Sequence, residues 1–190
     1  MQHSYKMGAG ALVAVLAAAP VVAQEVYVFD ARHTTPTFEV THIGFSQQRG
    51  LFGNTTGKVT LDRTAKKGTI EVSIASASLL MAPALQTLVK GDEFLNVEKF
   101  PTMTYTSSDL VFDGDNVVGA NGNFTMLGVT KPVALKLTSF KCAPNPFNKK
   151  PMCGGEATAT IKRSEFGMKA ALGAASDDVR IVIAFEGVKE

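Results

Sequence analysis

The sequence has few of the residues that enzymes use for nucleophilic, acid–base or metal chemistry. Its 190 residues include three histidines and two cysteines. It contains no Gly-x-Ser-x-Gly, no His-Glu-x-x-His and no glycine-rich loop of the kinds that cradle phosphates or dinucleotides. We therefore expect a binding protein with no catalytic site, no metal site and no cofactor.

An excess of charge of one sign is also missing. The chain carries 19 Lys and Arg residues against 17 Asp and Glu residues, and these are scattered along the sequence. A surface so nearly balanced produces no field strong enough to collect nucleic acid or an anionic membrane. We expect neither a nucleic-acid partner nor stable membrane insertion.

Long apolar runs are missing everywhere except at the N-terminus. There, Lys6 precedes a run of Ala, Leu and Val at residues 9–19, and small residues follow at positions 21–23. This order is typical of a cleaved secretory signal, and the apolar run is short for a membrane anchor. We predict that residues 1–23 are a signal peptide and that residues 24–190 form one periplasmic domain.

The two cysteines are Cys142 and Cys153. Behind a signal peptide they meet an oxidising compartment, so a disulfide is the expected state. The ten residues between them are rich in turn formers, which predicts a hairpin tip. The alternatives are a metal pair, which would want more ligands, and a redox dithiol, which would want closer spacing.

Short segments in which every second residue is apolar recur along the chain, a pattern typical of strands with one buried face. They are residues 26–30, 38–42, 57–62, 69–75, 102–107, 110–112, 117–126, 131–140, 155–162 and 179–185. Between the second and third segments, Gly44, Gly50, Gly53 and Gly57 predict a glycine-rich bend, because glycine enters φ > 0 without steric cost. The pattern predicts an all-β fold, an antiparallel barrel or sandwich of about eight strands.

The middle of the chain, residues 76–95, lacks strand alternation. Pro83 is tolerated in a first helical turn, and Leu85, Leu88 and Val89 follow at helical spacing. We predict a short helix there and a second one at residues 92–95. This insertion either caps the core or covers the mouth of a ligand site, and the sequence does not choose between them.

Four ordered motifs resemble the YceI-like family. They are Phe-x-Val-x-His-x-Gly-Phe-Ser at residues 38–46, Lys-Phe-Pro-Thr at 99–102, Gly-x-Phe-Thr-x-x-Gly-Val-Thr-x-Pro-Val at 122–133 and Arg-x-x-Phe-Gly-Met at 163–168. The resemblance runs from about Tyr27 to Glu186. It implies a lipocalin-like antiparallel β-barrel with a hollow interior that binds a polyisoprenoid, a quinone or another long-chain amphiphilic lipid.

A lipid carrier needs an apolar cavity and a few polar groups. The inward-facing residues that we expect to contact the ligand are Phe38, Val40, His42, Phe45, Phe52, Leu88, Phe94, Phe100, Met103, Tyr105, Phe124, Met126, Phe166 and Met168. Two other functions stay open, an interaction module with a packed barrel and an enzyme acting on the bound lipid. The oligomeric state is open too, a homodimer included.

Overall fold

The computed structural model describes residues 24–190, so the predicted signal peptide, residues 1–23, lies outside the described residues. Within this range the elements are β1 (Glu25–Phe29), β2 (Thr35–His42), β3 (Ser46–Phe52), β4 (Thr55–Asp62), β5 (Lys67–Ala75), η1 (Ser76–Ser78), β6 (Leu79–Leu80), α1 (Pro83–Lys90), β7 (Thr102–Asp113), β8 (Asn116–Met126), β9 (Val129–Pro144), β10 (Pro151–Lys162), η2 (Arg163–Phe166) and β11 (Asp178–Lys189).

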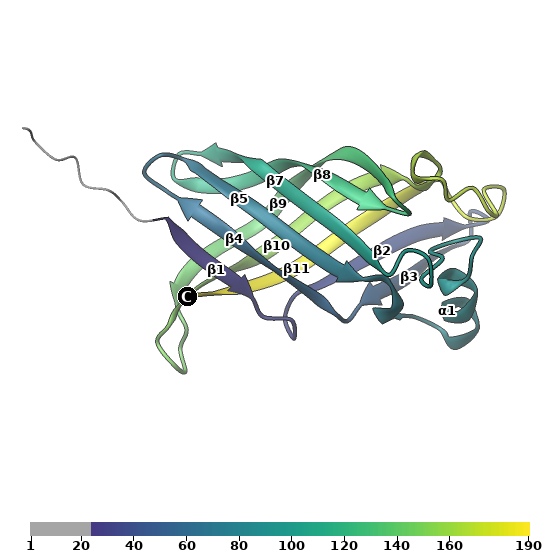
Figure 1. Cartoon of the computed structure of the whole chain (residues 1–190), viewed down its shortest axis with the longest axis horizontal. Coiled ribbons are helices and arrows are strands. Elements are labelled where there is room, and N and C mark those ends of the chain that lie inside the picture. Colours follow the sequence, from purple (N-terminus) through teal and green to yellow (C-terminus); the bar gives the residue numbers. More distant parts are fainter. Residues whose placement is uncertain (1–23) are drawn as a thin grey trace, which may run out of the picture.

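Eight of these strands form a closed antiparallel ring in the order β1-β4-β5-β7-β8-β9-β10-β11 (Figure 1). The ring closes where β11 pairs with β1, with Tyr27 opposite Lys189. Closure leaves no edge strand in the ring, and eight strands leave a bore that side chains fill or that holds one small ligand. The predicted eight-stranded antiparallel barrel with a short helix is confirmed.

One end of the barrel is wider than the ring, because β11 changes neighbour along its length. Residues 187–189 of β11 pair with β1, whereas residues 180–184 pair with β2. Strand β2 then pairs with β3, and β3 pairs with the short β6 that leads into α1. Helix α1 therefore lies at this widened end (Figure 1).

The predicted glycine-rich bend is wrong in one respect, because it contains a strand of its own. The chain turns at Ile43 and Gly44, whose φ angles are 42° and 77°, and then runs back as β3. Gly50 lies inside β3 rather than in a turn. A larger residue does not fit there, because a Cβ would stand 2.6 Å from the ring of Phe38. This glycine provides room for an aromatic side chain.

The first predicted helix is present and the second is not. Helix α1 begins at Pro83, in a position where its missing N–H costs nothing, and Gly91 follows its last residue. Residues 92–95 form turns instead, in which the Phe94 N–H donates to the Gly91 carbonyl and the Leu95 N–H donates to the Val89 carbonyl. Four residues are too few to nucleate a second helix without strong caps.

The buried side chains form two clusters along the barrel. The larger one, toward α1, includes Leu79, Met103, Tyr105 and Phe166. The smaller one includes Tyr27, Leu61 and Cys153, toward the opposite end. The smaller cluster fills part of the end that α1 does not cover, which we call the packed end.

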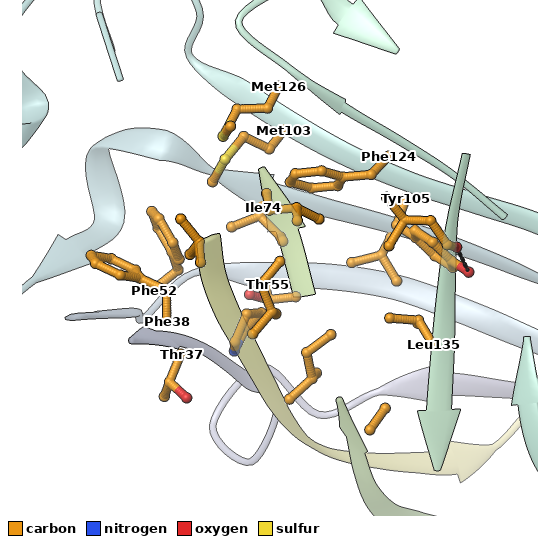
Figure 2. A pocket seen from close by; sticks show the side chains of 18 of the residues that line it. Thr37, Phe38, Phe52, Thr55, Ile74, Met103, Tyr105, Phe124, Met126 and Leu135 are labelled. Carbon is orange, nitrogen blue, oxygen red and sulfur yellow. Dashed lines mark hydrogen bonds between the residues drawn. The ribbon is translucent and has the colours of Figure 1, made fainter. Parts of the chain in front are cut away.

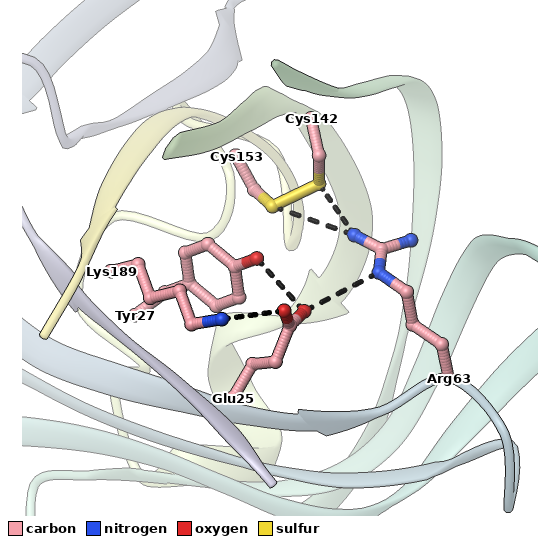
Figure 3. Close-up of a disulfide and its surroundings, with 6 residues drawn as sticks. All are labelled: Glu25, Tyr27, Arg63, Cys142, Cys153 and Lys189. Carbon is pink, nitrogen blue, oxygen red and sulfur yellow. Dashed lines mark hydrogen bonds and ion pairs between the residues drawn. A yellow bond between two sulfur atoms is a disulfide. The ribbon is translucent and has the colours of Figure 1, made fainter. Parts of the chain in front are cut away.

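The packed end carries the disulfide. Cys142 on β9 and Cys153 on β10 stand opposite each other and are bonded. Arg63 points one guanidinium nitrogen at the bridge, 2.8 Å from Cys142 Sγ, and lies 3.6 Å from a Glu25 carboxylate oxygen (Figure 3). The predicted disulfide is confirmed.

Glu25 joins the two chain ends beside this bridge. Its carboxylate accepts hydrogen bonds from Lys189 Nζ at 2.7 Å and from the Tyr27 hydroxyl at 3.0 Å (Figure 3). The hydrogen bond from Lys189 is the main reason that the pKa of Glu25 lies below its usual value. The Glu25–Lys189 ion pair thus fixes the closing strands β1 and β11 to each other.

Removal of the bridge will destabilise the fold. The double substitution Cys142→Ala and Cys153→Ala frees a loop of 11 residues, for which loop-closure entropy gives a loss of about 3 kcal/mol. Guanidinium unfolding of the oxidised protein and the variant measures this loss. Reductant should shift the wild type toward the variant and leave the variant unchanged; equal midpoints for both proteins would contradict the prediction.

The Glu25 hydrogen bonds will make the stability of the fold depend on pH. Because the folded pKa of Glu25 is lowered, its contribution is complete above the unfolded value near 4.5 and is lost as the pH falls through the folded pKa. We expect Glu25→Gln to lower the melting temperature at pH 7 and to lower it less at pH 3. Melting curves across that range test this, and a constant difference at every pH would contradict it.

Candidate ligand cavity

A narrow apolar cavity of about 340 Å³ runs through the barrel. All eight ring strands contribute to its wall, together with β2, β3 and α1. Along β4 it reaches from Thr55 to Leu61, roughly 20 Å at about 3.3 Å per residue. Its volume falls at the small end of the range of about 300–1,000 Å³ for sites that hold small molecules.

The strand period explains why this wall is apolar. Ile70, Val72 and Ile74 of β5 all face the cavity, and the residues between them face outward. Opposite Val72 stands Tyr105 of β7, and opposite Tyr105 stands Phe124 of β8. Neighbouring strands thus place apolar side chains side by side in the wall, and Figure 2 shows Ile74, Tyr105 and Phe124 among the side chains that line it.

The buried Tyr105 is held by its hydroxyl. The hydroxyl is shared as a donor between two carbonyl oxygens, that of Ala120 at 3.2 Å and that of Val133 at 3.1 Å. Burial raises the pKa of Tyr105 to about 12, so the phenol stays neutral. Gly122 gives its ring room, because a Cβ there would lie 2.5 Å from the Tyr105 oxygen.

The widened end of the barrel holds the mouth of the cavity. Met81, Leu85 and Leu88 border it from the α1 side. Ala171 and Ala175 border it from the loop of residues 167–177, which is fixed to the end of β2 by a bridge between His42 and Ala175. His42 itself is exposed there.

Arg163 fixes the shape of that loop from inside. Its side chain is 2% exposed. The guanidinium donates to the backbone carbonyls of four loop residues, at 2.7 to 3.3 Å, namely Met168, Ala170, Ala175 and Ser176. Burial lowers the pKa of Arg163, but an arginine stays protonated in proteins. Four of the five N–H donors of Arg163 are thus used by this loop.

Most of the residues predicted from the sequence to contact a ligand line the cavity. They are Phe38, Val40, His42, Phe52, Leu88, Phe94, Met103, Tyr105, Phe124, Met126 and Met168. Whether they touch a ligand stays a prediction, because the structure contains none.

Three predicted contacts do not line the cavity. Phe45 is 90% exposed, because the turn at residues 43–45 carries it past the end of β2. Phe166 is 1% exposed and packs edge-on against Phe124, with ring centroids 5.5 Å apart. Phe100 is half-buried beside Gly128. These three residues are thus absent from the cavity wall, and their contact with a ligand stays a prediction.

Sequence reasoning missed the polar residues of the wall, Thr55 and Arg163 foremost. A polar residue at an inward position looks in the sequence like one that faces water. The one signal was the position of Arg163 at the start of the Arg-x-x-Phe-Gly-Met motif.

Among residues 24–190, no three or more His, Cys, Asp or Glu side chains gather as a metal site would require. In the same range no helix is long and apolar enough to cross a membrane.

A closed β-barrel around an apolar interior cavity places the protein in the lipocalin-like class of folds. The family model described as the YceI-like domain matches residues 27–187. The chain belongs to the YceI-like family.

Relatives and solved structures agree with this assignment. Protein YceI of Salmonella heidelberg is 34% identical over 164 residues, which cover 85% of this chain and 84% of that protein. Burkholderia cenocepacia BcnA shares the fold with a TM-score of 0.69 and 19% identity, over 83% of this chain and 98% of that one. A polyisoprenoid binding domain from Saccharophagus degradans matches with a TM-score of 0.62 and 12% identity, over 86% and 98%.

Loss of the Arg163 guanidinium will loosen the loop at the mouth. Arg163→Met leaves buried carbonyls without donors, and we expect a loss of about 3 kcal/mol in unfolding free energy. Faster amide exchange within residues 167–177 should accompany it. Arg163→Lys keeps the charge but fewer donors, so its effect should be smaller. Unchanged stability and exchange in Arg163→Met would contradict this role.

Proposed function

We propose that this protein is a non-catalytic binding protein that holds a polyisoprenoid, a quinone or another long-chain amphiphilic lipid in its barrel cavity. The observation that carries the proposal is the cavity itself. It is long and almost wholly apolar, and α1 and the 167–177 loop contribute to its wall at the widened end of the barrel. Such a space suits a hydrocarbon chain better than a polar metabolite.

The energetics of a chain in this cavity are favourable. Burial gains about 0.8 kcal/mol per methylene, so one isoprene unit contributes on the order of 4 kcal/mol before costs. Association costs roughly 4–15 kcal/mol in lost freedom of motion. A few buried units therefore suffice for binding.

The likeness to a solved polyisoprenoid binding domain supports the ligand class. The adaptable side chains in the wall support it as well, because Met103, Met126 and Met168 can repack around a flexible chain. The cavity counts against a packed interaction module. A lipid-modifying enzyme would need reactive groups in the wall. Of the two histidines among residues 24–190, His33 and His42, His42 alone lines the cavity.

We further propose that the protein works in the periplasm. The signal-like N-terminus and the disulfide both fit an oxidising compartment outside the cytoplasm. A polyisoprenoid has no stable place in the water between two membranes. An enclosed apolar cavity would shield it there.

Filling the cavity with protein tests the proposal. Val72 faces the cavity, and its neighbour Glu71 is exposed on the outer face of the same strand. We expect Val72→Trp to lower binding of a four-isoprene alcohol at least tenfold, while Glu71→Trp leaves it unchanged. Displacement of a fluorescent lipid probe measures both, and the quenching of the new indole reports on position, because the chain has no tryptophan.

Overpacking of this kind costs about 1–3 kcal/mol of stability, so both variants need melting curves that confirm folding at the assay temperature. Equal binding by a folded Val72→Trp protein and the wild type would mean that the lipid does not occupy the cavity. Absence of binding by the wild type would end the proposal.

A further inference from the structure

The hydroxyl of Thr55 is the one buried side-chain oxygen or nitrogen within residues 24–190 that has no hydrogen-bond partner. The residue is 0% exposed and lines the cavity. Figure 2 shows it among the cavity side chains, and its backbone pairs with Ile74. Buried hydroxyls almost always find a partner, because leaving one unpaired costs free energy.

The other polar groups of the wall do not share this feature. Thr34 and Thr37 donate to backbone carbonyls of β11, and Tyr105 donates to carbonyls of β8 and β9. Arg163 donates four hydrogen bonds to the 167–177 loop. Gln48 is half-buried and donates to the Ser46 hydroxyl, and His42 is exposed, so water can satisfy it. Thr55 is left as the polar atom whose partner must come from inside the cavity.

The fold places Thr55 toward the mouth. It begins β4 directly after the turn that ends β3, and the last residues of β3 pair with β6, which leads into α1. From Thr55 the cavity continues along β4 past Val59 to Leu61, between apolar side chains. A ligand that reaches Thr55 with a polar atom can therefore lay a hydrocarbon tail toward the packed end.

The charge of the wall limits what that polar atom is. A phosphate or carboxylate buried beside Thr55 would need a cation, since an unpaired charge is costly in an apolar site. The one cationic group in the wall apart from the exposed His42 is Arg163, and four of its five N–H donors already bind carbonyls of the 167–177 loop. A neutral oxygen or an amide needs no such partner.

Building on the proposed function, we infer that the Thr55 hydroxyl is the recognition point for the head group of the lipid, and that this head group is neutral: an alcohol, a quinone carbonyl or a carboxamide. A valine would fill the same space without an unpaired hydroxyl. Thr55 thus selects an amphiphile over a plain hydrocarbon.

The test compares three probes with one four-isoprene skeleton: the alcohol, the diphosphate and the hydrocarbon without oxygen. Displacement of a fluorescent lipid measures each with wild type, Thr55→Val and Thr55→Ser. We expect Thr55→Val to weaken the alcohol about tenfold, the equivalent of about 1.4 kcal/mol, and to leave the hydrocarbon unchanged. Thr55→Ser should bind the alcohol within about threefold of the wild type.

The empty proteins give a second readout. Because the hydroxyl has no partner in the fold, Thr55→Val without lipid should melt at the same temperature as the wild type or higher. A lower melting temperature would show that the empty protein already satisfies the hydroxyl, and would overturn the inference.

Other outcomes separate the two levels of the argument. Suppose that the wild type binds the probes and that Thr55→Val weakens binding of the alcohol and of the hydrocarbon equally, or weakens binding of neither probe. The lipid-binding function then stands and the role of Thr55 is refuted. Tighter binding of the diphosphate than of the alcohol would overturn the neutral head group. If the wild type binds none of the three, the proposed function fails and the inference fails with it.

Discussion

The structure depends on the two-sided pairing of β11. This last strand pairs with β10 along one side, and on its other side it pairs with β1 at one end and with β2 at the other. The pairing of β11 with β1 closes the barrel, and the disulfide and the Glu25 hydrogen bonds lie at this seam. The pairing of β11 with β2 keeps the opposite end of the barrel wide, so that β2, β3 and α1 can border an opening.

The cavity follows from this geometry. A ring of eight strands has a bore that ordinary side chains nearly fill, and at the closed end the smaller cluster narrows it, although Leu61, Leu110 and Val117 of that cluster also line the cavity. At the other end the extra strands move the wall outward, so Phe38 and Phe52 border a space instead of filling it. Arg163 then holds the 167–177 loop at the rim by its own hydrogen bonds, which leaves Thr55 as the unsatisfied polar atom within.

Strand alternation predicted the wall where the strands belong to the ring. The inward positions Ile70, Val72 and Ile74 are in the cavity wall as their spacing indicated, and the disulfide followed from the signal-like N-terminus. Strand β3 was not predictable in this way. It lies outside the ring, its partner β6 has two residues, and its Gln47, Gln48 and Arg49 show no apolar alternation. Phe45 was misplaced for a related reason, since period-two counting cannot detect the turn that ends β2. Thr55 and Arg163 were missed because their roles depend on partners distant in sequence.

The central claim is that the cavity holds a lipid in the cell. Native mass spectrometry of the protein purified from its own host cells, followed by organic extraction, tests this most directly. We predict a mature chain beginning at Gln24, two hydrogens lighter than its reduced form, that carries one long-chain adduct with a neutral oxygen-bearing head group. The bare oxidised mass, with nothing in the extract, would contradict the claim.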